Sequence, residues 1–206
     1  MKRTKTGLLV LLFICVFLIA GTGISRAEMA RYDIDPDHST IEFSVVHMVI
    51  SKTTGRFTDY KGFVEMDTDG LKIKAMEAVI NTASVNTIHE KRDGHLKGED
   101  FFNVEKFPTM TYKMKYSRKE GDHYIAIGDL TLLGVTREVT LTGKFNGLVK
   151  DPYGNTRAGF TAEGKLNRKD FGMNWNKLLD SGGLVVGDDI SIKLEIECIK
   201  ANAAGK

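Results

Sequence analysis

The sequence has 206 residues, with 29 lysines and arginines against 27 aspartates and glutamates, and a formal net charge of +2. This length suits one domain with a sizeable core. Nearly balanced charge without a clustered excess of basic residues argues against a protein that binds nucleic acid electrostatically.

Residues 1–27 have the three-part pattern of a cleaved export signal. A basic start precedes an unbroken apolar run over residues 8–20, and a small residue stands at Ala27, where signal peptidase requires a short side chain. We expect cleavage between Ala27 and Glu28, which leaves residues 28–206 as a single, slightly acidic domain in the periplasm, with release from the cell as a variant. An uncleaved membrane anchor is the alternative, but the apolar run over residues 8–20 is shorter than the roughly 20 apolar residues that a membrane span needs.

Alternation of apolar and polar residues dominates the remaining chain and is typical of strands with one dry face. It is clear at residues 41–49, where Ile41, Phe43, Val45 and His47 share one parity. It is equally clear at residues 137–149, with Val139, Leu141, Phe145 and Val149 on the dry face, and at residues 190–198. Weaker alternation occurs at residues 61–68, 71–85, 109–117, 123–133 and 157–167.

The links between these segments contain glycine, asparagine and aspartate, which form tight turns, so neighbouring strands are expected to pair antiparallel. Strands this long favour a closed barrel over a sandwich. The predicted fold is therefore all-β, an eight-stranded antiparallel barrel. Glycines inside the strands either let them coil or leave room for an internal cavity, and the sequence does not decide between the two.

Two polar stretches, residues 87–103 and 168–180, interrupt the alternation. Thr87 is placed to cap a short helix, with Glu90 three residues further on. We expect both stretches to form short helical segments that cover an end of the barrel.

No catalytic or metal-binding signature emerges. His89 and His95 are spaced i, i+6, about 240° apart around a helix, whereas a zinc-binding helix needs two histidines on one face. Arg92 and Asp93 are adjacent and are interpreted as a structural ion pair or an anchor rather than a catalytic pair. Cys198 has the parity of the dry face and is expected to be a buried, inert thiol. The sequence thus predicts no cofactor, no metal and no enzyme.

A series of ordered motifs resembles the YceI-like family of exported, lipocalin-like proteins over residues 32–199. The matching stretches are residues 35–39, 43–48, 55–57, 92–96, 100–104, 107–109, 128–131, 134–137, 156–160 and 167–173. The resemblance implies an eight-stranded antiparallel barrel whose apolar pocket holds a polyisoprenoid chain, such as a polyprenyl phosphate or a quinone. Many relatives have arginine where this chain has Val46, which by parity points away from the pocket.

Together these features predict a periplasmic carrier or storage protein for a long isoprenoid lipid. Transient contact with a membrane is expected. The sequence does not decide the oligomeric state, and a homodimer is one of the alternatives. The expected pocket wall consists of Ile41, Phe43, Val45, Leu130, Leu132, Phe145 and Phe160, with His47 as a polar contact. The expected rim consists of Phe101, Phe102, Phe171 and Trp175. Two alternatives remain: an exported enzyme that acts on isoprenoid or quinone-like substrates through His47, and a stress-related adaptor with a protein partner.

Overall fold

The computed structural model describes residues 29–69, 71–180 and 182–202. The predicted signal and its cleavage site at Ala27 and Glu28 lie outside these ranges. The strands are β1 (Met29–Ile34), β2 (Thr40–His47), β3 (Ser51–Phe57), β4 (Tyr60–Asp67), β5 (Lys72–Asn81), β6 (Val85–Asn86), β7 (Thr109–Glu120), β8 (His123–Leu132), β9 (Val135–Lys150), β10 (Thr156–Asn167) and β11 (Val186–Lys200). Helix α1 spans Glu90–Lys97, and three 3-10 turns, η1 to η3, span Pro36–His38, Thr82–Ser84 and Arg168–Phe171.

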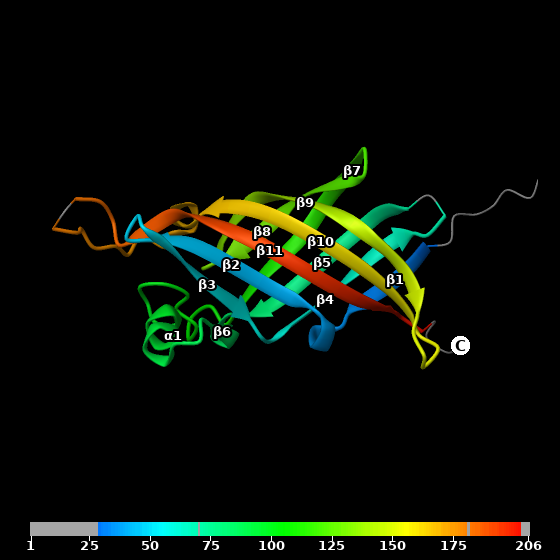
Figure 1. Cartoon of the computed structure of the whole chain (residues 1–206), viewed down its shortest axis with the longest axis horizontal. Helices are drawn as coiled ribbons and strands as arrows, with labels where there is room; N and C mark the ends of the chain where they lie inside the picture. Colours follow the sequence, from blue (N-terminus) through cyan, green and yellow to red (C-terminus); the bar gives the residue numbers. More distant parts are fainter. Residues whose placement is uncertain (1–28, 70, 181, 203–206) are drawn as a thin grey trace, which may run out of the picture.

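The strands form one antiparallel sheet that closes on itself as a barrel (Figure 1). Its order is β1-β4-β5-β7-β8-β9-β10-β11, and pairing of β1 with β11 completes the circle. Further along β11, β2 replaces β1 as the neighbour, and β3 pairs with β2. Thus β1–β2 and β3–β4 act as two long bent strands, and the predicted barrel of eight antiparallel strands is confirmed.

The bend between β1 and β2 is made by η1, which begins at Pro36. Proline suits the first position of a helical turn because its missing N–H has no intrahelical acceptor there. The Asp35 side chain accepts from the Asp37 N–H at 3.1 Å and caps the turn. The chain can therefore turn here and still continue along the same neighbour, β11.

Tightly packed side chains fill the barrel end where β1 meets β11. Tyr32, Met66, Ala158 and Cys198 are each no more than 1% exposed. Burial raises the pKa of the Cys198 thiol to about 12, so it stays protonated at neutral pH. The predicted burial of Cys198 is confirmed. This packed layer makes one end of the barrel the closed end.

An ion-pair network around Arg157 fastens the closed end. Its guanidinium contacts Asp35 at 2.7 Å, Asp151 at 2.8 Å, and Glu197. His38 adds a contact to Asp35 at 2.9 Å. The network joins η1, the β9–β10 turn and β11, so a single cation organises the carboxylates of three segments.

The prediction that Val149 lies on the dry face is wrong. The register between β9 and β10 shifts at a bulge between Gly159 and Phe160, so Leu148 rather than Val149 pairs with buried Ala158. Val149 is consequently 63% exposed. A bulge inserts one extra residue and inverts the facing of every residue after it, which simple alternation cannot anticipate.

One α-helix, α1, and the turn η3 occupy the two polar stretches, in agreement with the predicted one or two short helical segments. In the described ranges no helix is both long and apolar enough to cross a membrane. The capping prediction is wrong in detail, because His89 is the N-cap of α1 and its ring accepts from the Arg92 N–H at 3.3 Å. Thr87 is instead buried, at 5% exposure, beneath the helix.

Several strand glycines allow close approach of neighbouring atoms and do not create space, whereas Gly147 has a positive φ and no neighbouring atom within 4 Å. A Cβ on Gly128 would lie 2.6 Å from the Lys113 carbonyl oxygen, and a Cβ on Gly143 would lie 2.1 Å from that of Thr161. Neither distance is sterically possible for a real Cβ. The open interior described below is therefore not explained by these two glycines.

Candidate functional site

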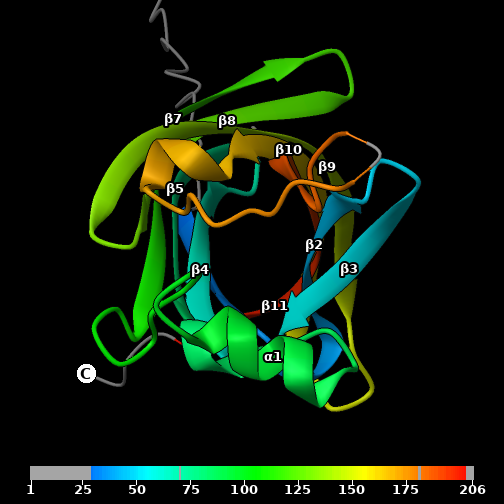
Figure 2. The ribbon, with the colours of Figure 1, turned by 90° about the vertical axis from the view of Figure 1, so that its left-hand side faces the viewer.

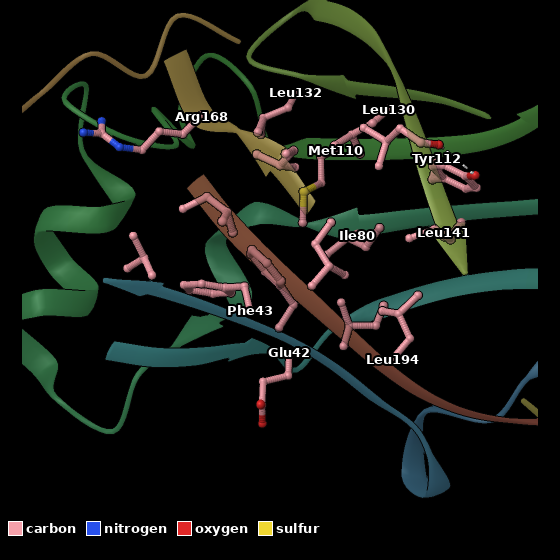
Figure 3. A pocket seen from close by; sticks show the side chains of 18 of the residues that line it. Glu42, Phe43, Ile80, Met110, Tyr112, Leu130, Leu132, Leu141, Arg168 and Leu194 are labelled. Atoms are coloured by element: carbon pink, nitrogen blue, oxygen red, sulfur yellow. Dashed lines mark hydrogen bonds between the residues drawn. The ribbon is translucent and has the colours of Figure 1, made fainter. Parts of the chain in front are cut away.

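The barrel encloses a cavity of about 480 Å³ that opens at the end opposite the closed end. Figure 2 looks toward this open end, with α1 lying across part of it. Side chains from most of the strands point into a common space (Figure 3). The volume lies within the range of sites that bind small organic ligands. We refer to the open end as the mouth.

One wall of the cavity is made of inward side chains that protein atoms cover only in part. These residues come from β2 and β11 and are only half-buried: Ile41, Phe43, Val45, Ile190, Ile192, Leu194 and Ile196. Their inward position follows from the alternation along each strand and the register between the two strands. Large apolar side chains inside a barrel normally bury one another, so this uncovered surface is available to an apolar ligand.

The opposite wall is tightly packed. It includes Met110, Tyr112, Leu130, Val139 and Leu141, all less than a tenth exposed and all in contact with the cavity. The Tyr112 hydroxyl lies 3.4 Å from the carbonyl oxygens of Ala126 and Val139, and burial raises its pKa to about 12. The hydroxyl is therefore neutral and already has backbone partners, so this wall is chemically apolar.

An aromatic cluster lines the mouth. The Trp175 ring lies 4.9 Å from His95 and 5.3 Å from Phe101, measured between ring centroids, and His95 lies 5.0 Å from Phe101. His95 also contacts Asp100 at 2.9 Å. The cluster joins α1, the segment after it and the loop of residues 172–185, so three elements that are distant in sequence form one rim.

Helix α1 is anchored to the barrel through Thr87. The Asp93 carboxylate accepts from the Thr87 N–H at 2.9 Å and from its hydroxyl, and Arg92 donates to the Thr87 hydroxyl and carbonyl oxygens at 2.7 and 2.9 Å. These bonds hold the pKa of Asp93 below its ordinary value, although burial acts in the opposite direction. The predicted anchoring role of Arg92 and Asp93 is confirmed.

Arg168 is a buried cation at the mouth that the sequence analysis did not single out. It is 1% exposed, and its guanidinium donates to the carbonyl oxygens of Gly187, at 2.9 Å, and Met173. Burial lowers its pKa, and Asp188, at 3.4 Å, partly opposes this effect. Figure 3 shows it at the end of the cavity where α1 lies. The available signal was a basic residue immediately after a strand that leads to the mouth.

Most of the predicted pocket residues line the cavity: Ile41, Phe43, Val45, His47, Phe101, Phe102, Leu130, Leu132, Phe160 and Trp175. Val46, expected to point away from the pocket, is exposed and does not line it. His47 lies near the mouth, where it pairs in register with Val186.

Phe145 and Phe171 do not line the cavity. Phe145 packs on Phe160, with ring centroids 5.4 Å apart, on the part of β9 beyond the lining residue Gly143. Phe171 is 2% exposed in the core because η3 turns it inward, and Arg168 and Met173 face the cavity in its place. Parity alone could not resolve the ends of the cavity or the path of a 3-10 turn.

Known proteins resemble this chain in sequence and in fold. The YceI-like domain family matches residues 32–198. A UPF0312 protein of Yersinia pestis is 44% identical over 149 residues, which cover 71% of this chain and 78% of the relative.

Among solved structures, the YCEI protein of Campylobacter jejuni matches with a TM-score of 0.66 at 32% identity, over 76% of this chain and 90% of that one. A structure described as a polyisoprenoid binding domain from Saccharophagus degradans matches with a TM-score of 0.62 at 17% identity, over 84% and 100% of the respective chains. At 17% identity the likeness shows a shared fold.

Proposed function

We propose that this chain, which belongs to the YceI-like domain family, binds and carries a long isoprenoid lipid inside its barrel. The observation that carries the proposal is the half-buried apolar wall of β2 and β11, which faces open space inside the barrel. The description of the Saccharophagus degradans structure as a polyisoprenoid binding domain supports the same ligand class.

Apolar transfer supplies the binding energy. Each CH₂ group moved from water into an apolar site contributes about 0.8 kcal/mol, so a five-carbon isoprene unit contributes about 4 kcal/mol before the cost of ordering the chain. A few units inside a cavity of about 480 Å³ are enough for tight binding without polar contacts along the chain. Specificity for the head group then depends on the mouth.

The charges at the mouth favour a phosphate head group over a neutral quinone ring. Lys91, Arg92 and Arg168 all contact the cavity there. Glu42, the one acidic residue of the lining, points away from the apolar side chains (Figure 3). Exposed Arg92 keeps N–H donors beyond its hydrogen bonds to Thr87, and guanidinium groups bind phosphate well. Arg168 is buried, and its three guanidinium nitrogens already donate to Gly187, Met173 and Asp188, so it adds positive charge rather than a free donor. We therefore propose a polyprenyl phosphate as the ligand, and the predicted export signal supports a periplasmic location.

The test is retention of a prenyl lipid by purified protein. Wild-type protein is loaded with a polyprenyl phosphate, freed of excess lipid, and measured by native mass spectrometry and by analysis of the organic extract. Leu194→Arg places a charge in the middle of the apolar wall and is expected to abolish retention, because burying an unpaired charge is very costly. Glu195→Arg places the same side chain on the exposed outer face one residue away and is expected to retain lipid.

Circular dichroism and thermal unfolding check that both variants fold. Retention of lipid by folded Leu194→Arg would contradict the pocket, and a wild-type protein that takes up no prenyl lipid would contradict the function. Loss in both variants would point to a general effect of added charge and would also contradict the pocket assignment.

A further inference from the structure

The mouth carries four large aliphatic side chains that folding leaves in water, which we call the mouth collar. Val49 is 69% exposed, Ile50 85%, Leu178 81% and Ile88 91%. They belong to the β2–β3 turn, the loop of residues 172–185 and the approach to α1. Figure 2 shows these three segments arranged around the opening of the barrel. Exposed apolar residues on separate segments around one opening indicate an interaction surface.

The backbone of the collar adopts positive φ angles at positions that carry large apolar side chains, which rarely occur in that conformation. The β2–β3 turn has Met48 and Val49 at φ 51° and 67°, and the Ile50 N–H donates to the His47 carbonyl oxygen at 3.2 Å. A turn with two positive φ values favours Asn-Gly. Ile88 also has a positive φ, 60°, which is unusual for a β-branched residue. Folding gains neither burial nor easy turn geometry from these residues, so their presence calls for another explanation.

The collar is continuous with the cavity. His47 and Val185 line the cavity and lie next to the collar in sequence or space. The Met48 N–H donates to the Val185 carbonyl oxygen at 2.8 Å, which ties the β2–β3 turn to the loop that carries Leu178. An apolar chain that leaves the cavity would therefore meet collar side chains before it met water.

We propose that the mouth collar docks the open end of the barrel onto the surface of a lipid bilayer, so that a prenyl chain passes between bilayer and cavity without crossing water. This inference rests on the proposed function, because it names the partner that the same cavity faces. Aliphatic side chains at the mouth enter the boundary between head groups and acyl chains, as they do in interfacial proteins.

Unpaired lysines on the collar segments suit the anionic surface of a bilayer. Lys52, Lys91 and Lys177 are exposed on the collar segments and make no ion pair with any described residue. Anionic head groups would neutralise them. Exposed carboxylates also occur at this end, at Glu90, Glu99, Asp100 and Asp180, and Asp100 is paired with His95. In a two-fold dimer through the mouth, the same unpaired lysines would be brought together.

The test is co-sedimentation with vesicles of three parts phosphatidylcholine to one part phosphatidylglycerol. The variant Met48→Asn/Val49→Gly removes apolar surface and installs the dipeptide that the turn prefers. We expect its melting temperature to be equal to or above that of wild type, and its partition onto vesicles to fall by about tenfold or more. The matched control, Val149→Thr/Tyr153→Asn, removes exposed apolar surface at the closed end and is expected to bind vesicles like wild type.

The outcomes separate this inference from the proposed function. Prenyl retention is measured in parallel without vesicles, and the collar variant is expected to retain lipid. Equal vesicle binding by the collar variant and wild type, or equal losses in both double variants, would overturn docking whatever the retention result. A wild-type dimer in sedimentation velocity that the collar variant abolishes would assign the collar to a second copy and would also overturn it. Vesicle binding without prenyl retention would leave docking standing and refute the carrier function.

Discussion

Filling the cavity from one wall gives the sharpest test of where the isoprenoid chain lies. Ala78 is an inward residue of β5 that pairs with Gly62 on β4 and Tyr112 on β7 and lines the cavity. It is half-buried because its methyl group faces the open interior. The substitution Ala78→Phe places an aromatic ring in that space.

The ring occupies roughly the room of one five-carbon isoprene unit. Excluding one unit from the cavity loses about 4 kcal/mol of apolar transfer, which corresponds to about a thousandfold in the dissociation constant. The loss is largest for a chain that just fills the cavity, because a longer chain already leaves units outside. Without ligand, the ring fills empty apolar space, so we expect the unfolding temperature to be maintained or raised.

The assay is a titration with prenyl phosphates of increasing chain length, followed by native mass spectrometry. Ala75→Phe is the matched control, because Ala75 pairs with Glu65 and does not line the cavity. We expect Ala78→Phe alone to weaken binding and to shorten the best-bound chain by about one unit. Unchanged affinity in folded Ala78→Phe would refute the placement of the chain in the barrel interior.

Three further predictions concern the mouth and the closed end. Lys91→Glu should weaken binding of a polyprenyl phosphate by about tenfold or more but leave the uncharged prenyl alcohol unaffected, as measured by parallel titrations; equal effects on both would contradict a phosphate at the mouth. Trp175, the single tryptophan, should change its fluorescence when the full chain is loaded, and a spectrum identical with and without ligand would exclude contact at the rim. Arg157 holds the pKa of Asp151 well below its ordinary value, and the bonds of Asp35 lower its pKa as well. The stability that these two ionised carboxylates contribute is complete above the unfolded pKa of about 3.9 and is lost as the pH falls toward their folded pKa values. Arg157→Met should therefore lower the melting temperature at pH 7 more than at pH 2. An equal loss at both pH values would contradict the ion-pair network.

Local pattern was enough to locate the strands that have one fully apolar face. In β11, Ile190, Ile192 and Leu194 alternate with polar residues, and all three point inward as predicted. By contrast, β3 was not predicted, because its inward positions include Thr53 and Gly55. Gly55 is required there since a Cβ would lie 2.4 Å from the Phe43 ring. When a residue type is required by the side chain on a neighbouring strand, its own strand does not show the alternation of apolar and polar residues.

In the candidate site too, some features could be predicted from local pattern and others could not. Alternation identified Ile41, Phe43 and Val45 as wall residues because the pleat of a strand fixes their direction. The mouth depends on α1, η3 and the loop of residues 172–185, which come together only in the closed barrel. Arg168 and the rim cluster around His95 therefore could not be assembled from spacing along the chain.

The sequence by itself determined an all-β chain, antiparallel pairing, the buried state of Cys198 and most of the pocket wall, because each follows from local turn chemistry and side-chain parity. Tertiary structure alone decided that the interior is open rather than filled, where the cavity ends, and that Val49 and Ile88 gather at its mouth. The physical reason is that parity states which way a side chain points. How much space lies in front of it depends on the width of the closed barrel and on strands that are distant in sequence.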